Sequence, residues 1–167
     1  MISGASGYIG ARLVSCALDR GLKVTVLSHS GEKKGHGSGV RSFHWSLSGS
    51  VPKEAFEPSN GFGNVDAVIH AAHVWESDQP EESDENVVGS RVLLMAARKA
   101  GVKTFLFCSS VSARESALNR YGRVKWAIAR QLKGPNEIEV RIGLVYGGPR
   151  RGQWGNLCKL VRTLPIF

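Results

Sequence analysis

Long apolar runs and paired cysteines are both missing from this sequence of 167 residues. No apolar run approaches the roughly 18 residues of a membrane-spanning helix, and the N-terminus lacks a charged region followed by an apolar signal core. The three cysteines, Cys16, Cys108 and Cys158, are an odd number and lie far apart, which argues against a disulfide framework. We therefore expect a soluble, cytoplasmic protein without a membrane partner.

Internal repeats, low-complexity segments and a clear set of metal ligands are also absent. His70 and His73 lie three positions apart, but no cysteine or carboxylate completes a ligand set, so no metal site is predicted. We expect these imidazoles to line a cofactor or to cap a strand. With 42% hydrophobic residues and 20 glycines, the chain suits one compact domain. Its net charge of +8 fits either an anionic nucleotide ligand or nucleic acid, and charge alone does not distinguish between these two partners.

Three glycines at a spacing of three, Gly4, Gly7 and Gly10, stand between a short apolar strand and an amphipathic helix. Such a turn lets the backbone approach a pyrophosphate and places the phosphates at the helix N-terminus. Glycine clusters also mark ordinary loops, but here strand, turn and helix occur in the required order. Gly21 is expected to end the helix. The residues expected on its buried face are Ile9, Leu13, Cys16 and Ala17.

Residues 23–27 form a β-branched run that predicts a second, parallel strand. In dinucleotide folds the end of this strand meets the adenosine ribose, where an acid favours NAD and a basic group accepts the phosphate of NADP. Ser28 and His29 follow the strand, no acid occurs before Glu32, and Arg12 is a candidate cation. We therefore expect NADP, with NAD as the alternative.

The middle of the chain continues the alternation of strands and helices. A mobile loop at 31–39 and an edge-like strand at 40–45 are followed by a continuous apolar run at 65–72, which is typical of a central strand. Six carboxylates between Glu76 and Glu85 predict a solvated entry to a helix over 86–100. The apolar residues of this helix expected to face the core or a dimer partner are Val88, Val92, Met95 and Ala96.

A serine-rich strand end and a tyrosine-lysine pair carry the predicted chemistry. Residues 102–108 predict a strand that delivers Ser110 and its serine neighbours to the carboxyl edge of the sheet, where open α/β proteins bind ligands. Tyr121 and Lys125 lie one turn apart on a predicted helix, so their heads can converge. We expect the lysine to lower the pKa of the phenol, which then acts as acid or base while the serine orients the substrate oxygen.

These segments resemble the extended short-chain dehydrogenase/reductases, the NAD-dependent epimerase/dehydratase group. The resemblance implies a Rossmann-type, doubly wound parallel sheet with helices on both faces, and a catalytic triad of Ser110, Tyr121 and Lys125. It also implies that Lys125 binds the nicotinamide ribose. The matching segments are residues 4–10 (GASGYIG), 66–72 (DAVIHAA), 86–90 (NVVGS), 108–110 (CSS), 121–125 (YGRVK) and 141–147 (RIGLVYG).

The cofactor-binding residues follow from the glycine turn, the strand ends and the resemblance. They are Gly4, Ser6, Gly7, Tyr8, Ile9, Gly10, Ser28, His29, Ser46, Leu47, Ala71, Ala72, Tyr121 and Lys125. Ser46 and Leu47 enter because the acid usual after the third strand of the family is absent there. Other departures are a short loop between Ser110 and Tyr121, Ala129 in place of a glutamate, and Ile142 in place of a proline.

Residues 1–148 are expected to form the NAD(P)-binding domain and residues 149–167 the start of a mostly absent substrate-binding region, with the first strand also incomplete. Arg150, Arg151, Lys159 and Arg162 would form a basic cluster that meets a substrate diphosphate or is simply solvated.

The predicted activity is oxidoreductase, epimerase or dehydratase chemistry on a hydroxyl or carbonyl of a small molecule, with a nucleotide sugar preferred. The alternatives are a non-catalytic regulatory or RNA-binding protein on the same fold and a catalytically silent subunit. We expect a homodimer through helices near 86–100 and 121–133.

Overall fold

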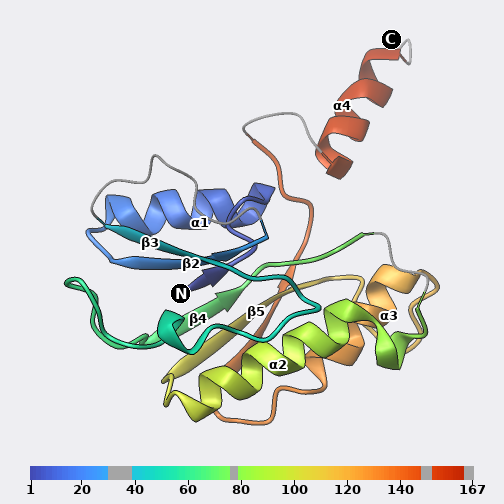
Figure 1. The fold of residues 1–167 in the computed structure, drawn as a ribbon. Helices are drawn as coiled ribbons and strands as arrows, with labels where there is room; N and C mark the ends of the chain where they lie inside the picture. The colour runs from blue at the N-terminus through green and yellow to red at the C-terminus, as the bar shows by residue number, and fades with distance from the viewer. Residues whose placement is uncertain (30–38, 76–78, 148–151, 164–167) are drawn as a thin grey trace.

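The computed structural model describes residues 1–29, 39–75, 79–147 and 152–163. In these residues a parallel sheet of six strands has the order β3-β2-β1-β4-β5-β6 (Figure 1). The strands are β1 (Ile2–Ser3), β2 (Val24–Ser28), β3 (Val40–His44), β4 (Ala67–His70), β5 (Thr104–Ser110) and β6 (Glu137–Ile142). The helices longer than one turn are α1 (Tyr8–Asp19), α2 (Glu85–Lys99), α3 (Arg120–Ala129) and α4 (Gly152–Thr163).

The strand order reverses between β1 and β4, which lie side by side in the middle of the sheet. α1 packs on one face, and α2 and α3 pack side by side on the other (Figure 1). This confirms the predicted doubly wound Rossmann-type fold with helices on both faces. In such folds the crevice for ligands opens at the carboxyl ends of the strands beside the reversal.

α1 begins after the glycine turn and ends at the predicted glycine, because Gly21 adopts a φ of 71° that favours glycine. Its buried face agrees with the expected one in part, since Leu13 and Ala17 pack against the smaller core cluster. Gly10 and Val14 are the buried residues, whereas Ile9 and Cys16 are only partly covered. The face is centred on Val14 because the close approach at Gly10 turns that side of the helix toward the sheet.

Of the four α2 residues predicted to face the core or a dimer partner, Ala96 packs against the core, and a dimer contact by the other three stays a prediction. Val88 and Val92 are partly exposed and Met95 is 60% exposed. The buried residues of the helix are Asn86, Val87, Gly89, Ser90, Leu93, Leu94 and Ala97. Gly89 explains the choice of face, because a Cβ there would lie 2.3 Å from the carbonyl oxygen of Leu47. The helix packs closely on the backbone after β3, which no larger residue would allow.

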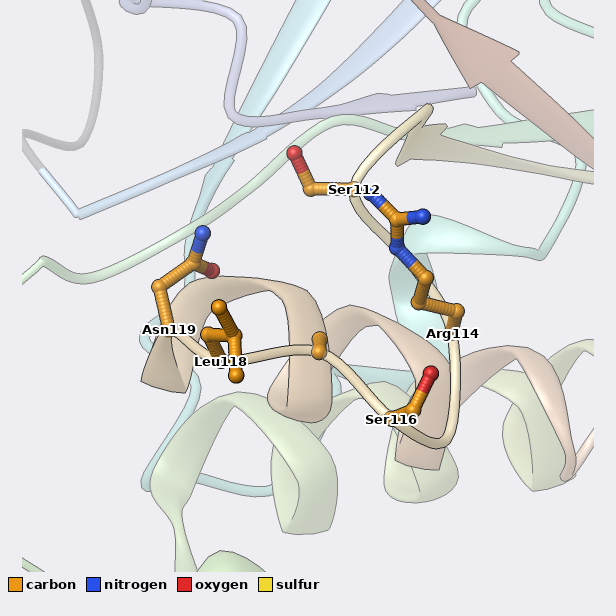
Figure 2. A pocket seen from close by; sticks show the side chains of 6 residues that line it. Ser112, Arg114, Ser116, Leu118 and Asn119 are labelled. Carbon is orange, nitrogen blue, oxygen red and sulfur yellow. The ribbon is translucent and has the colours of Figure 1, made fainter.

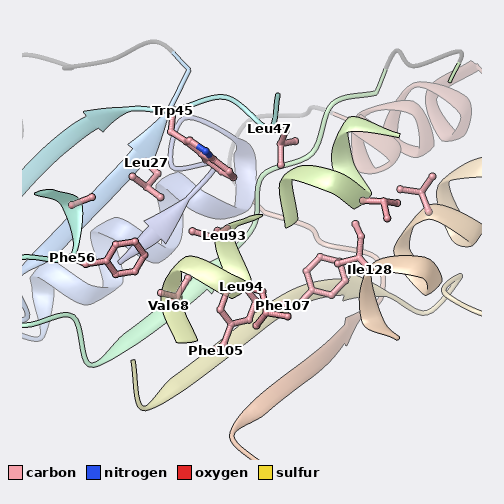
Figure 3. Packing of buried hydrophobic residues seen from close by; sticks show 14 residues of the cluster. Leu27, Trp45, Leu47, Phe56, Val68, Leu93, Leu94, Phe105, Phe107 and Ile128 are labelled. Atoms are coloured by element: carbon pink, nitrogen blue, oxygen red, sulfur yellow. The ribbon is translucent and has the colours of Figure 1, made fainter. Parts of the chain in front are cut away.

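The main hydrophobic core lies between the sheet and α2 with α3 (Figure 3). Leu27, Leu93 and Phe107 are fully buried in it, and Trp45 joins it from the segment after β3. A second, smaller cluster lies between α1 and strands β1 and β2. The two cores therefore cover opposite faces of the sheet.

α4 lies away from the sheet (Figure 1). Lys159 and Arg162 are exposed on it, whereas Arg150 and Arg151 of the predicted basic cluster lie outside the described residues, as does most of the predicted loop at 31–39. Within the described part of the chain, no helix combines the length and the apolar character needed to cross a membrane.

Candidate active site

The glycine turn brings β1, α1 and the tip of β4 into close contact. Gly4 has a φ of 70°, and a Cβ on it would lie 2.6 Å from the Cα of Ala72. A Cβ on Gly10 would lie 2.1 Å from the carbonyl oxygen of Gly4. Both positions therefore require glycine. Ala71 continues the pairing of β4 with β1, since its N–H donates to the carbonyl oxygen of Ser3 at 3.2 Å.

The N-terminus of α1 is open for an anion. Gly7 is its N-cap and offers no side-chain acceptor to the first-turn N–H groups, which include those of Tyr8 and Ile9. Ser6 and Gly7 are exposed in front of them. Unpaired N–H groups at the positive end of a helix dipole bind phosphate oxygens. The cradle fits the pyrophosphate of a dinucleotide.

The ends of β2 and β3 form the neighbouring part of the edge. Ser28 is buried, whereas the exposed His29 lies with its ring 5.5 Å from that of His44. The Ser46 hydroxyl is 2.9 Å from that of Ser48, and the side chain of Leu47 is buried in the core. Leu47 can therefore meet a ligand only through its backbone.

Ser110, Tyr121 and Lys125 converge at the end of β5. Ser110 is the last residue of the strand, and its hydroxyl accepts a hydrogen bond from the N–H of Ser112 and forms another with Tyr121. The Lys125 ammonium lies 5.7 Å from the centre of the Tyr121 ring. α3 starts at the right place because the side chain of Asn119 accepts a hydrogen bond from the N–H of Gly122.

Lys125 is a buried cation, and few favourable contacts offset the cost of burying its charge. Its Nζ donates to the carbonyl oxygen of Cys108 at 2.9 Å and lies 4.8 Å from the centre of the Phe107 ring. Burial lowers the pKa of Lys125 to about 8. An ammonium has three donors, so the bond to Cys108 leaves two for a ligand.

The expectation that Lys125 lowers the pKa of Tyr121 is wrong for the protein without ligands. Burial raises the pKa of this phenol, and the hydrogen bond from Ser110 opposes that rise only in part. The ammonium donates to the carbonyl oxygen of Cys108, and it is not among the causes that shift the pKa of Tyr121. Tyr121 is therefore a neutral proton donor in this state.

His70 is an internal link between elements, whereas the sequence predicted that it lines a cofactor or caps a strand. It is fully buried, with Nδ1 2.6 Å from the Ser3 hydroxyl and Nε2 2.7 Å from the Ser90 hydroxyl. Ser90 donates its only proton to the carbonyl oxygen of Asn86, so His70 must donate from Nε2 and accept at Nδ1. Burial lowers the pKa of His70 to about 3, and the neutral ring connects β1 to α2.

Asp84 departs from the predicted solvated entry to α2. Its carboxylate is 1% exposed, caps α2 through the N–H of Asn86 and pairs with Arg120, the residue before Tyr121. Glu81 pairs in the same way with Arg123. The pattern of six carboxylates gave no signal for these contacts, because both partners come from a distant helix.

A cavity of about 430 Å³ lies along the loop that joins β5 to α3 (Figure 2). Figure 2 shows Ser112, Arg114 and Asn119 extending into the same space from different parts of this loop. In the described residues no cluster of three potential metal ligands exists.

The strand order, the glycine turn and the serine, tyrosine and lysine at the carboxyl edge define a dinucleotide-binding domain of the short-chain dehydrogenase/reductase type. Residues 1–132 match the model of the NAD dependent epimerase/dehydratase family, and the chain belongs to this family. The family is NAD-dependent, which confirms the expected nicotinamide dinucleotide; the preference for NADP stays a prediction.

Individual relatives agree with the family. UDP-glucose 4-epimerase of Klebsiella pneumoniae is 33% identical over 67% of this chain and 88% of its own length. A crystal structure of UDP-galactose 4-epimerase has a TM-score of 0.64 at 25% identity and covers 97% of this chain and 62% of that one. WbmG of Bordetella bronchiseptica, solved with NAD and UDP, has the same TM-score at 22% identity, over 84% of this chain and 51% of that one. The chain spans only 34% and 32% of two other curated relatives.

Proposed function

We propose that the protein is an NAD(P)-dependent oxidoreductase, epimerase or dehydratase that acts on a hydroxyl or carbonyl group of a nucleotide sugar. The observation that carries this proposal is the convergence of Ser110, Tyr121 and Lys125 at the sheet edge that also bears the glycine turn. Membership of the family favours this activity over the regulatory or RNA-binding alternative.

The three residues have separate roles in the proposed reaction. Tyr121 gives a proton to the reacting oxygen of the substrate or takes one from it, and Ser110, already hydrogen-bonded to Tyr121, orients that oxygen. Lys125 supplies positive charge that stabilises the phenolate formed when the proton leaves. Hydride transfer is the chemistry that the dinucleotide supplies when bound.

The proposed cofactor site follows the edge of the sheet from α1 to α3. The glycine turn holds the pyrophosphate, and the two free donors of Lys125 bind the nicotinamide ribose. The residues proposed to contact the dinucleotide are Gly4, Ser6, Gly7, Tyr8, Ile9, Gly10, Ser28, His29, Ser46, Leu47, Ala71, Ala72, Tyr121 and Lys125. With Arg12 exposed on α1, NADPH is expected to bind more tightly than NADH, and equal affinities would refute this preference.

The nucleotide sugar is supported by the relatives. The Klebsiella relative is a UDP-glucose 4-epimerase, and WbmG was solved with NAD and UDP.

We place the dinucleotide-binding domain at residues 1–148 and the start of the substrate-binding region at 149–167, in agreement with the position of α4 away from the sheet. Removing residues 149–167 should therefore weaken UDP-glucose binding and leave NADH binding unchanged; the opposite pattern would refute this division.

Substitution of Tyr121 tests the proposed activity. Tyr121→Phe should lower turnover of UDP-glucose with bound NAD at least a thousandfold and change the affinity for NADH less than twofold, because only the proton donor is lost. Ser110→Ala should lower turnover about a hundredfold. Ser109→Ala is the matched control, since the hydroxyl of Ser109 donates to Glu139 rather than to Tyr121. Full activity of Tyr121→Phe would refute the assignment.

We further propose a homodimer through α2 and α3. The apolar residues Val88, Val92 and Met95 follow one another at helical spacing on the outer side of α2, and Met95 is 60% exposed. Met95→Glu should convert a dimer to a monomer in sedimentation equilibrium. A monomeric wild-type chain at micromolar concentration would refute this interface.

A further inference from the structure

Two aromatic side chains, His73 and Trp75, surround the ring of Tyr121. Trp75 is stacked on it, with ring centres 5.1 Å apart and an interplanar angle of 15°. His73 stands edge-on to both, 4.9 Å from Trp75 and 5.0 Å from Tyr121, at angles of 88° and 84°. Stacked and edge-to-face contacts are the favourable geometries for aromatic pairs. The proton-donating ring is therefore one member of an aromatic triad.

The backbone that carries His73 and Trp75 is held in place by hydrogen bonds. Val74, which lies between His73 and Trp75, donates its N–H to Oδ1 of Asn86 at 2.8 Å and accepts from Nδ2 of the same side chain at 3.0 Å. Asn86 is itself 2% exposed at the start of α2 and also bonds Asp84. A buried amide that satisfies both backbone groups of one residue holds that residue in place.

Trp75 nevertheless remains 75% exposed, although one side of its ring lies on Tyr121. What distinguishes Trp75 from other exposed apolar residues, such as Leu22, is its stacking on Tyr121. On the part of the chain that the structure describes, nothing but His73 and Tyr121 stacks with it. A flat apolar surface is thus open to solvent directly beside the group that exchanges the substrate proton.

We propose that Trp75 is a specificity-determining residue against which the sugar ring of the substrate stacks. This inference rests on the proposed function, because the reacting hydroxyl must reach the oxygen of Tyr121 and the ring that carries it must then lie beside the indole. The C–H groups on one face of a pyranose carry partial positive charge, and the face of an aromatic ring is negative. The indole thereby selects a substrate by the face of its sugar, whereas the diphosphate and the base bind elsewhere.

Calorimetric titrations with UDP-glucose and with UDP, both in the presence of NAD, test the role of Trp75. Trp75→Ala should weaken binding of UDP-glucose about tenfold and change binding of UDP less than twofold, because UDP has no sugar to stack. Trp75→Phe, which keeps an aromatic face, should recover affinity for UDP-glucose to within about threefold of wild type. Leu22→Ala is the control, since Leu22 is a large exposed apolar residue just before the amino end of β2, whereas the site lies at the carboxyl ends of the strands.

Each outcome decides between the proposals. Equal weakening of UDP and UDP-glucose by Trp75→Ala would show a structural effect and overturn the stacking role, as would unchanged binding of UDP-glucose. In both cases turnover by the wild-type chain would leave the proposed function standing. A wild-type chain that binds NAD but neither UDP nor UDP-glucose would overturn the nucleotide-sugar substrate and the role of Trp75 together.

Discussion

The buried charge of Lys125 is unfavourable for the folded protein without ligands. Its ammonium is buried against one carbonyl oxygen and the faces of two rings, and no ion pair to it occurs within the described residues. Burying a charge without an anionic partner is unfavourable. A ligand that accepts hydrogen bonds from the ammonium would relieve this cost, which favours binding of a ribose there.

The lowered pKa of Lys125 predicts a stability that rises with pH. The folded-state pKa is about 8 against 10.5 in the unfolded chain, so the unfolded chain binds the extra proton between these values. The unfavourable free energy of burying the charged lysine is complete below pH 8 and disappears as the pH rises toward 10.5. Urea unfolding gives the free energy of unfolding of wild type and of Lys125→Met at each pH. From pH 7 to pH 9.5, the difference between the two should change by about 2 kcal/mol in favour of wild type. The exposed Lys53 provides the control variant Lys53→Met, and parallel curves for wild type and Lys125→Met would contradict the prediction.

Individual residues were predictable where local chemistry identifies them. The spacing of Tyr121 and Lys125 and the glycine turn need only one helix or one turn, and the sequence contains both. Trp75 was not predictable, because its role depends on the stacking of a segment after β4 on a side chain of α3. The raised pKa of Tyr121 likewise depends on burial, which spacing does not show.

At the scale of elements, ion pairs connect the start of α2 to the start of α3. Asp84 and Glu81 come from the segment before α2, and Arg120 and Arg123 come from the first turn of α3. Because Arg120 precedes Tyr121, the first pair fixes the helix end that carries the proton donor. The more buried pair, with Asp84 only 1% exposed, should contribute the larger part of this stabilisation.

A double-mutant cycle on Asp84 and Arg120 measures this connection. Asp84→Ala should lower the free energy of unfolding by about 3 kcal/mol, since it removes a helix cap together with the buried carboxylate that pairs with Arg120. The coupling energy with Arg120→Ala should be about 1 kcal/mol or more. Glu82→Ala, at an exposed position in the same short segment, should change stability by less than about 0.5 kcal/mol. A coupling energy near zero would contradict the connection.

The helix α2 shows why elements are easier to predict than their faces. Its existence and ends follow from periodicity and from Gly101, which has a φ of 70°. Its buried face includes Asn86, Gly89 and Ser90, residue types that a hydrophobic pattern assigns to the outside. They are buried because Gly89 allows close contact with the backbone of Leu47 and because Ser90 and Asn86 complete a polar network.

At the scale of the whole molecule, the sheet order gathers the site from segments far apart in sequence. β1 and β4 meet at the reversal, and β5 lies next to β4. The glycine turn, the small residues after β4 and Ser110 therefore share one edge. The order of motifs predicted this arrangement, since parallel strands connected by helices bring their carboxyl ends together.

The central claim is that the first turn of α1 holds the pyrophosphate of a nicotinamide dinucleotide, and Gly7 tests it most directly. Gly7 is the N-cap, with an extended backbone at φ of −75° that any residue can adopt. Asp and Asn both cap helices well and add the same Cβ, but only the carboxylate repels a phosphate. Titration of NADH fluorescence should show saturable binding to wild type, with Gly7→Asp at least tenfold weaker than Gly7→Asn and no less stable to heat. Equal affinities of the two variants for NADH, or no binding by wild type, would contradict the claim.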